Sequence, residues 1–548
     1  MRCIAQDIRN RWHRLLSERS SYELGWRQSS KLVFPRSGRF LASDRNRGGD
    51  RSNEILDNTV TRAVRTLAAA MVAGMSSPAS KWMRLTTSSP ELDESHAVKT
   101  WLSKVETAQF MIFAKSNTYR ALHSLYEEQI VYGQASDIID DNYRTVIHNH
   151  TLTVGEYAFA CDSLGQVDTL YREFDMTVSQ LVETFGINNV SGYVRRRYES
   201  REYDYWVTVL HAIEPRRGRD TRKRDNLNMR WRSVYIERDG DKCVVLRESG
   251  YEDFPALCPR WIVRPPDVYG DSPVMDALGD IKQLQHEQLR KSKGIDWQTD
   301  PAIIYPANFK DSLLDTRPGS AVFGNAAAQT AAQPVFDARY MNLSYLLQDI
   351  EDVRKRIHDA LYTNVILMIA EGGDQQKTAR EISAREVEKL MVLGPVLERQ
   401  QAEILEPLVN LTFMKALRAG ILPPPPPEIQ GQELSVEYIS MLAQSQRAFG
   451  LAATDRFVSK LGMISEIKPE VLDRFDADRW VDVVSDAEGV DPSIIVAGPQ
   501  AAIIRQQRAE QEQAAKQAMA MQQGADIAAK LSSADMSGDN ALTQMAGM

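Results

Sequence analysis

Apolar residues along the chain follow a helical period in some stretches and a strand-like texture in one long stretch. Residues 54–75 place their apolar side chains on one face of a helix, and residues 94–132 continue as helix to Gly133. From 136 to about 263, β-branched and aromatic residues recur in short runs between turn residues, which is typical of a sheet. The expected strands are 145–147, 156–161, 166–174, 203–213, 232–238 and 243–248, with a small helix over 177–185.

Two paired helices are predicted beyond this sheet. Val274, Leu278, Ile281 and Leu284 keep helical spacing, and after alanine-rich loop sequence the spacing resumes over 340–361. The pattern predicts an outgoing helix, a small distal module and a returning helix of about 25 residues, or ~37 Å. Two helices that carry a small module away from a body form a stalk.

A glycine loop and a new helix start follow the stalk. The apolar run 365–370 ends at Gly372 and Gly373, whose backbone freedom lets the chain leave its helix. Thr378 and Glu381 fit a capping box, in which the threonine oxygen and the glutamate satisfy the first free amides of a helix. We therefore expect a new helix to begin at Thr378.

This new helix is predicted to be unusually long and kinked. Its apolar stripe continues over about 40 residues, or ~60 Å, to a capping glycine at Gly420. A proline removes one helical hydrogen bond and clashes with the preceding turn, so we expect a kink at Gly394 and Pro395 and a milder bend at Pro407. Five consecutive prolines at 423–427 then exclude helix.

The C-terminal part is predicted to be helical with a fraying end. Residues 433–484 have helical spacing, and residues 500–548 are rich in Ala, Gln and Met. That composition can form a lone helix, but Gly524 and the Ser/Asp/Gly-rich end predict fraying. We expect about the last 25 residues to be mobile.

Composition indicates an ordinary folded protein of several parts. The 548 residues are 43% hydrophobic and 26% charged, and the formal charge of -8 argues against a protein that coats nucleic acid, though not against a channel. Neither a signal peptide nor a membrane span is apparent, so folding in the cytoplasm is expected. The four cysteines are far apart, which suits a reducing compartment and predicts buried thiols instead of a disulfide framework or zinc site.

Residues that resemble catalytic or ligand motifs have simpler explanations. The stretch from Gly372 to Thr378 resembles a phosphate-binding loop but lacks the glycine before Lys377, so a helix start is favoured. His148 and His150 share a strand face but lack a third metal ligand nearby, which favours a solvated strand. No hydrolase or protease motif is present, so no catalytic residue, metal or cofactor is expected.

Charged clusters leave one question open. Asp137, Asp140 and Asp141 surround an expected loop start, where turn roles explain them. The basic segment 216–224, preceded by 195–197, either contacts DNA or an acidic partner, or is a solvated hairpin tip. The sequence favours neither.

The ordered set of segments resembles the portal, or head-to-tail connector, proteins of short-tailed, T7-like bacteriophages. The resemblance rests on TAREISAREVEKLMVLGPVLERQQAEILEPL, GILPPPP and VEYISMLAQSQR, with support from YGDSPVMDALGDIKQL and LDNTVTRAVRTLAAAMVAGMSSPASKWMRL. Each segment alone is a generic helix or turn, but together they span most of residues 54–500 in one order. The similarity implies a mixed α+β, predominantly helical, portal-like fold. The implied parts are a wing with N-terminal helices and a sheet-rich body (1–270), stem helices (271–298 and 339–366), a small α/β clip (299–338), a tunnel loop (367–377), a long kinked helix (378–420), a helical crown (421–500) and a low-complexity, partly disordered tail (501–548).

The resemblance also implies a function and partners. Such proteins form a ring of about twelve copies at one capsid vertex, through which double-stranded DNA is pumped in by a separate terminase and later leaves. Implied partners are the terminase large subunit, tail adaptor and tail tube proteins, and the major capsid and scaffolding proteins, without a membrane; the ring would reside in the virion, after assembly in the host cytoplasm. The candidate DNA-channel residues are Gly372, Gly373, Gln375, Gln376 and Lys377 in the loop and Arg290, Lys291 and Lys293 in the stem.

Two other function classes remain as alternatives. A nucleotide-driven enzyme would need a complete phosphate loop, which the sequence lacks. A cytoplasmic helical scaffold or adaptor would bind partner proteins through the stalk and have no DNA channel. The size of the native particle separates a ring from either alternative.

Overall fold

The computed structural model of the chain divides into two compact units. One unit contains Met1–Arg84, Val105–Pro423 and Val436–Ala443, and the other contains Leu85–Lys104, Pro424–Ser435 and Gln444–Met548. The residues that the structure describes are 3–40, 54–87, 92, 95–223, 225–239, 243–299, 303–304, 333–334, 344–363, 394–429, 434–438, 457–463, 468, 475–477, 479–481, 484, 494, 496 and 498–532.

A five-stranded antiparallel sheet forms the body of the first unit. Its strands follow the order β4-β5-β6-β7-β8, so each strand pairs with its neighbour in the sequence. Five of the six predicted strands fall in or next to observed strands, but the predicted strand 243–248 begins only at Arg247. The bounds are β4 (Tyr157–Cys161), β5 (Val167–Thr177), β6 (Trp206–Pro215), β7 (Trp231–Glu237) and β8 (Arg247–Tyr251).

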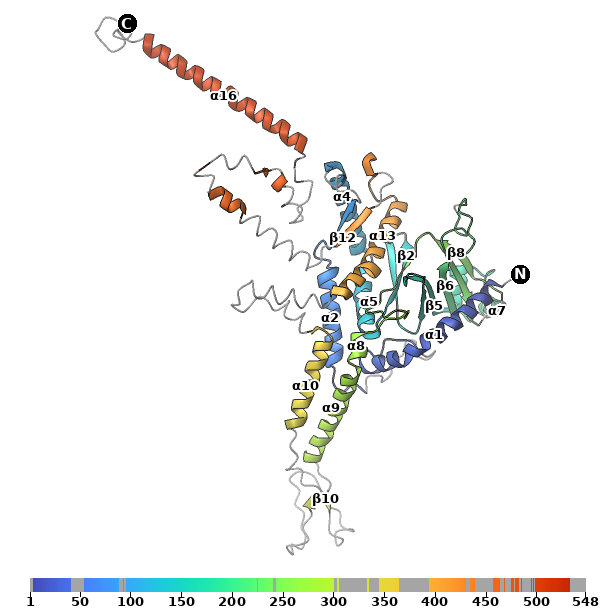
Figure 1. Cartoon of the computed structure of the whole chain (residues 1–548). Helices are drawn as coiled ribbons and strands as arrows, with labels where there is room; N and C mark the ends of the chain where they lie inside the picture. The colour runs from blue at the N-terminus through green and yellow to red at the C-terminus, as the bar shows by residue number, and fades with distance from the viewer. Residues whose placement is uncertain are drawn as a thin grey trace. The chain divides into compact units, whose positions relative to one another are not determined.

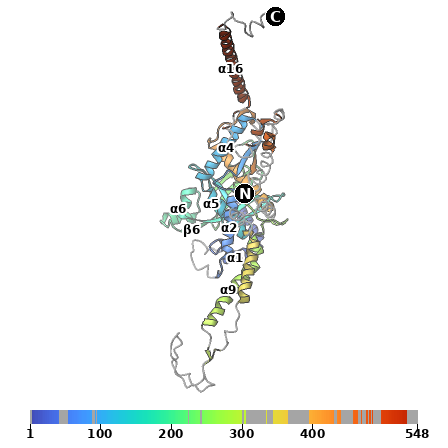
Figure 2. The same ribbon diagram turned by 90° about the vertical axis from the view of Figure 1, so that its left-hand side faces the viewer.

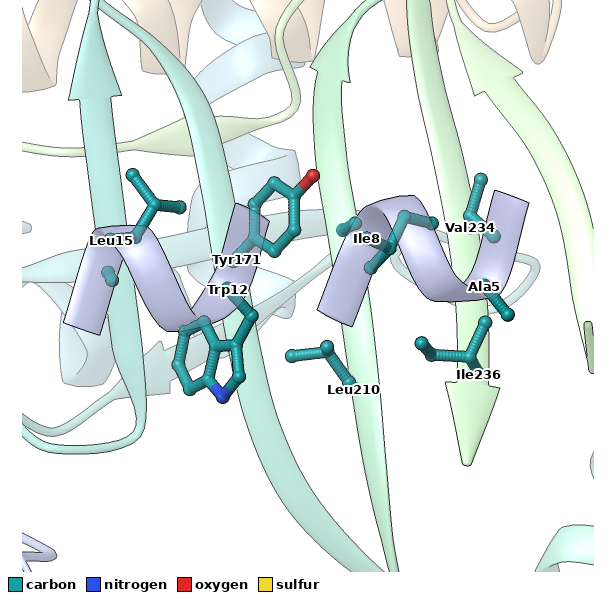
Figure 3. Packing of buried hydrophobic residues seen from close by; sticks show 10 residues of the cluster. Ala5, Ile8, Trp12, Leu15, Tyr171, Leu210, Val234 and Ile236 are labelled. Carbon is teal, nitrogen blue, oxygen red and sulfur yellow. The ribbon is translucent and has the colours of Figure 1, made fainter. Parts of the chain in front are cut away.

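Helix α1 (Ile4–Leu32) covers one face of this sheet (Figure 3). Ala5, Ile8, Trp12 and Leu15 recur every three or four residues, so they lie on one side of the helix. They pack against side chains from β4 to β7 in one buried cluster with Ala158, Tyr171, Leu210, Ala212, Val234 and Ile236.

Two short helices cover the opposite face. Helix α6 (Val178–Phe185) confirms the small helix predicted over 177–185. It begins with a capping box formed by Thr177 and Gln180. It packs with α7 (Gly192–Glu199) against side chains that include Val209, whose neighbour Leu210 lies on the α1 side. Successive side chains of β6 point to opposite faces of the sheet, so this strand contributes to the hydrophobic core under α1 and to the one under α6 and α7.

A three-stranded sheet corrects the prediction for the acidic cluster. Strand β2 (Ser136–Asn142) lies between β3 (Val146–Leu152) and β9 (Ala256–Leu257), so Asp137, Asp140 and Asp141 lie in a strand and not at a loop start. Asp137 is buried and accepts hydrogen bonds from Asn149 Nδ2 (2.6 Å) and Thr151 Oγ1 (3.2 Å). Burial raises the pKa of Asp137 to about 7 in spite of these hydrogen bonds. The prediction missed β2 because one of its four buried residues is an aspartate, which interrupts the apolar pattern of the strand.

The N-terminal helical predictions are confirmed with one division. Helix α2 (Thr59–Met75) lies within the predicted 54–75, whereas 94–132 forms two helices, α4 (His96–Lys115) and α5 (Thr118–Tyr132). Helix α5 ends at Gly133, which adopts a left-handed conformation with φ 81°. A Cβ at Gly133 would lie 2.0 Å from the carbonyl oxygen of Gly270, so this close approach requires glycine.

The cysteine prediction is wrong for two of the four residues. Cys3, just before α1, forms a disulfide with Cys243, just before β8, and the two Cα atoms are 5.4 Å apart. Cys161 and Cys258 are free; Cys258 is buried as expected, whereas Cys161 is only half-buried. The 240-residue separation of the bonded pair hid it from sequence spacing.

The outgoing and returning helices of the stalk are present. Helix α8 (Pro273–Asp276) leads into α9 (Leu278–Thr299), and α10 (Ser344–Ala360) returns beside it (Figures 1 and 2). Between them the structure describes only the antiparallel pair β10 (Ile303–Ile304) and β11 (Gln333–Pro334). We call α9 and α10 together the stem.

Helical structure after the stem is described from residue 394. It continues through a π-helical turn (Gln401–Leu405) into α13 (Glu406–Arg418). A short 3-10 helix (Pro427–Ile429) ends the proline-rich segment. The expected capping box at Thr378 lies outside the described residues.

The predictions for the C-terminal part need two corrections. Residues 434–438 form strand β12 (Leu434–Tyr438), which pairs with β1 (Met83–Thr87) and is not helical, because Val436 and Tyr438 alternate in a pattern that suits a strand. Helix α16 (Gly498–Ser532) continues through Gly524, where fraying was expected. Among the described residues, no helix is both long and apolar enough to cross a membrane.

We expect Trp12→Ala to destabilise the first unit strongly. Trp12 is only 3% exposed and stacks on Tyr171 with ring centroids 6.5 Å apart. Its removal should cost roughly 3–5 kcal/mol, measured as a lower denaturation midpoint. Leu24→Ala is the matched control, because Leu24 lies on the same helix and is 67% exposed. Equal midpoints for the two variants would contradict the packing of α1 on the sheet.

Candidate functional site: the stem and the long helix

The two stem helices are antiparallel and contact each other at two levels. Near the body, Arg356 Nε lies 3.2 Å from Asp280 Oδ1. Two helical turns further out, Asp349 of α10 is close enough to Glu287 of α9 that, together with burial, it raises the pKa of Glu287. Away from the body, residue numbers rise along α9 and fall along α10. The two contacts therefore define which residues of the two helices lie side by side.

A buried carboxylate holds both helices at the root of the stem. The Asp57 side chain, just before α2, accepts hydrogen bonds from Arg354 Nη2 of α10 (2.6 Å) and Gln288 Nε2 of α9 (2.9 Å). It also accepts the amide of Thr59 (2.9 Å), one of the amides at the start of α2 that have no partner within the helix. Burial alone would raise the pKa of Asp57, but the hydrogen bonds from Thr59 and Arg354 outweigh it and lower that pKa.

Gln285 completes this root with three further hydrogen bonds. Its Oε1 accepts the backbone amides of Leu56 (2.7 Å) and Asp57 (2.9 Å), while its Nε2 donates to the Asp57 carbonyl (2.8 Å). The side chain is buried, so the backbone before α2 is satisfied by a residue more than two hundred positions away. The root therefore fixes α2, α9 and α10 to one another.

The three predicted stem cations do not share one face. Successive residues in an α-helix are about 100° apart, so Arg290 and Lys291 point in different directions. Arg290 and Lys293 are exposed, whereas Lys291 is half-buried. Contact of these cations with DNA stays a prediction.

The predicted loop residues cannot be compared with the structure. Gly372, Gly373, Gln375, Gln376 and Lys377 lie outside the described residues. Gly394 and Pro395 are described as helical, but the preceding residues are not described, so the kink stays a prediction.

At Pro407 the helix changes its hydrogen bonding. The amide of Glu406 donates to the carbonyl of Gln401, five residues back instead of four. Pro407 has no amide hydrogen and would clash with the carbonyl of Glu403 in a regular α-helix, so a wider turn avoids the conflict. The irregularity expected at this proline thus takes the form of a π-helical turn.

The π-helical turn presents Glu403 to a buried arginine. Arg260 donates through its backbone amide (2.7 Å) and Nη2 (2.8 Å) to the two carboxylate oxygens of Glu403. Arg399 Nη1 donates to the same carboxylate at 3.1 Å. Burial would lower the pKa of Arg260, but the Glu403 carboxylate raises it above its ordinary value. This Arg260–Glu403 latch joins the long helix to the segment before α8.

The end of the long helix is confirmed in detail. Gly420 has φ 67°, and its amide donates to the Leu417 carbonyl (3.0 Å) while the Ile421 amide reaches the Ala416 carbonyl (3.2 Å). These two bonds are the Schellman motif, which a glycine at this position favours.

The remaining candidate clusters have structural surroundings. His150 Nε2 lies 3.4 Å from Asp140, and in the described part of the chain no group of three possible ligands could hold a metal ion. Residues 216–223 of the basic segment lie in the connection between β6 and β7, which agrees with the hairpin-tip interpretation. Its first arginine, Arg216, points inward to Glu248 (2.9 Å), whereas Arg217 and Arg219 are exposed. Contact of this tip with a partner stays a prediction.

The sequence interpretation missed the residues that hold the site together. Asp57, Gln285 and Arg354 lie far apart in the sequence and belong to no motif, and the same holds for Arg260 and Glu403. The one available signal was Asp57 itself, because an aspartate just before a helix is a typical capping residue. Nothing local indicates its partners.

A family model described as "Bacteriophage head to tail connecting protein" matches residues 5–496. The chain belongs to this family. The match includes the stem, its root and the latch, so the predicted family is confirmed.

Two curated relatives of the connector are similar over nearly their full length. The "Probable portal protein" of Bordetella phage BPP-1 is 53% identical over 537 residues, which are 98% of this chain and 97% of the relative. The "Portal protein" of Salmonella phage epsilon15 is 39% identical over 97% of this chain and 96% of the relative. This connector is therefore similar in sequence to portal proteins from end to end.

Solved structures are similar at a lower level. One chain of the neck of an empty gene transfer agent particle is 12% identical, with a TM-score of 0.35 over 77% of this chain and 93% of that chain. A chain from the virion of the native particle gives a TM-score of 0.33 at 12% identity, over 74% of this chain and 86% of that chain.

We expect Asp57→Asn to loosen the root of the stem in a pH-dependent way. The charged hydrogen bonds of Asp57 should contribute about 1.5–3 kcal/mol near neutral pH. Because folding lowers the pKa of Asp57, this stability is complete above about pH 4 and is lost as pH falls through the lower folded value. Melting temperatures of both proteins across this range check the prediction.

The matched control for this variant is Asp352→Asn, which removes an exposed carboxylate that pairs with Arg356. It should change stability by less than about 1 kcal/mol. A difference between wild type and Asp57→Asn that does not shrink in acid would refute the assigned role of the Asp57 charge.

Loss of the latch should also destabilise the first unit. Glu403→Ala leaves Arg260, which is 4% exposed, without its carboxylate, and should cost roughly 3 kcal/mol by chemical denaturation. Glu398→Ala is the control, because Glu398 is an exposed acid on the same helix and should have an effect within about 0.5 kcal/mol. Similar midpoints for both variants would count against the latch.

Proposed function

We propose that copies of this connector assemble into a portal ring of about twelve subunits at one vertex of a phage capsid. DNA enters the capsid through the ring during packaging and leaves through it during ejection. The observation that carries the proposal is the 53% identity to a probable portal protein over 98% of this chain. The identity covers the stem and the long helix as well as the sheet-rich body.

The charge of the chain suits a channel that DNA must slide through. Each chain has a formal charge of -8, so a ring of about twelve carries on the order of a hundred negative charges. A largely acidic lumen repels the duplex and keeps it from adhering while it moves. Passage then requires only a few weak contacts to phosphates, which carry no sequence information.

The proposed parts of the ring follow the predicted organisation. In this proposal the sheet-rich body is the wing, the stem lines the channel, and residues 299–338 form the clip. The crown lies within 421–500, and Lys377 and its glycine loop face the duplex. Tail adaptor and tail tube proteins and the terminase large subunit are the proposed partners at the clip, and capsid and scaffolding proteins at the wing. The motor is the terminase, so this chain itself hydrolyses no ATP.

The size of the native particle tests the proposal. Electron microscopy of the purified chain should show closed rings with a central hole, and native mass spectrometry should give about twelve subunits. The competing function is a helical scaffold without a channel, which would give a monomer or dimer even at high concentration. That result would reject the ring.

We expect Lys377→Ala to leave ring formation intact and to change DNA packaging or retention. The lysine follows the paired glycines, so it supplies a cation at the proposed tunnel loop. Packaged DNA per particle, measured against wild type, checks the prediction. Lys516→Ala is the control, because Lys516 lies on the exposed helix α16 and should have no effect on packaging. Unchanged packaging in Lys377→Ala would remove this lysine from the mechanism.

A further inference from the structure

The Cys3–Cys243 disulfide is at the surface of the sheet-rich body. Cys243 is exposed and Cys3 is half-buried. Cys3 directly precedes α1, and Cys243 lies in the connection between β7 and β8. Reagents in solution therefore have access to this bond from the Cys243 side.

The other two cysteines are protected from the same chemistry. Cys258 is buried, and burial raises the pKa of its thiol to about 12. Cys161 is half-buried, and burial raises the pKa of its thiol as well. The thiolate is the reactive form of cysteine, so these two residues exchange slowly at neutral pH. Redox chemistry at the cysteines of this chain is therefore concentrated on the Cys3–Cys243 pair.

Noncovalent contacts hold the start of α1 at the end of β7 without help from the disulfide. Arg9 Nη2 donates to the Glu237 carbonyl (2.9 Å) and Arg9 Nε donates to the Arg238 carbonyl (2.9 Å). Ala5 and Ile8, in the first turns of the helix, are buried against the sheet (Figure 3). These contacts keep the two cysteines close together when their sulfur atoms are thiols, so the bond closes without a change of fold.

The place of synthesis and the final place of a portal favour opposite states of this pair. A phage protein is made inside a bacterial cell, where small thiols keep most cysteines reduced. A portal then leaves that cell as part of the particle and enters oxidising surroundings. A surface pair that is held together without its covalent bond suits both conditions in turn.

We propose that Cys3 and Cys243 form a reversible redox staple, with two thiols during assembly and a disulfide in the released particle. The oxidant is a small-molecule disulfide. The Cys243 thiolate attacks one of its sulfur atoms and releases a first small thiolate. The Cys3 thiolate then attacks the Cys243 sulfur of the mixed disulfide and releases a second. The small disulfide is thereby reduced to two thiols, which take up the two protons of the cysteines.

The closed staple stabilises the subunit through the unfolded state. It links two positions that are 240 residues apart, so it removes much of the freedom of the unfolded chain. The change from assembly to the released particle rests on the proposed function, whereas the chemistry of the pair does not. The two are therefore tested separately.

Counting thiols in the wild-type chain tests the chemistry. After alkylation in denaturant, mass spectrometry should find four thiols in the chain kept in excess reduced glutathione. After the folded chain has stood in excess oxidised glutathione, it should find two, with Cys3 and Cys243 in one linked peptide. Return of the folded chain to reduced glutathione should restore all four.

The melting temperature tests the effect on stability. Oxidation should raise it by about 5 °C and leave the circular dichroism of the folded chain unchanged. Cys3→Ser and Cys243→Ser should each lose this rise and melt as the reduced wild type does. Cys161→Ser is the matched control, because it removes a thiol outside the pair and should keep the rise.

Alkylation of cells before lysis and of released particles tests the timing, with four thiols expected in the cells and two in the particles. A bond already present inside the cells overturns the staple. So does a bond that opens only in denaturant, or a temperature rise that survives Cys243→Ser, and each of these results leaves the portal ring standing. A chain that closes and opens the bond but forms no ring supports the chemistry of the pair and overturns the proposed function.

Discussion

The carboxylate of Asp57 is the contact on which the geometry of the stem depends. Three elements that are remote in the sequence meet at this side chain: the start of α2, Gln288 of α9 and Arg354 of α10. Burying the Asp57 carboxylate without partners would cost free energy. The folded state therefore favours the arrangement in which both stem helices donate hydrogen bonds to it. The distal parts of the hairpin then inherit their register from this root.

The register in turn determines which side chains of the stem are available to other molecules. With Glu287 and Asp349 on the inner sides, the outward residues follow from helical geometry alone. The outward positions include one exposed leucine on each helix, Leu289 on α9 and Leu347 on α10, whereas Ile281, Leu284, Ile350 and Val353 are buried.

Much of the fold could be predicted from local pattern, and the failures have identifiable causes. Helices with a clear stripe and a capping signal were found, such as α2 and the end of α13 at Gly420. Strand β2 was missed because Asp137 is buried with a raised pKa, and burial of a carboxyl group gives no apolar signal. The Cys3–Cys243 pair was missed because only the folded sheet brings β8 near the start of α1.

The sequence predicted where the stem helices lie but not the side-chain contacts that hold them. Spacing placed the stem, but the contacts that hold it depend on glutamine, arginine and aspartate side chains with no shared period. In the long helix, Val396 and Gln400 are the buried residues before the π-helical turn, whereas the apolar Leu397 is half-buried. One extra residue in that turn rotates the preceding segment by about 100°, which a continuous helical period cannot reveal.

The π-helical turn is a defect of one extra residue in the helix, comparable to a dislocation in a crystal. An extra residue in a helix can travel along it, because each step exchanges one backbone hydrogen bond for another and leaves the rest intact. Here the defect is pinned on both sides. Pro407 has no amide to exchange, and the Glu403 carboxylate is held by Arg260. The orientation of the segment from Gly394 is therefore locked to the body of the subunit.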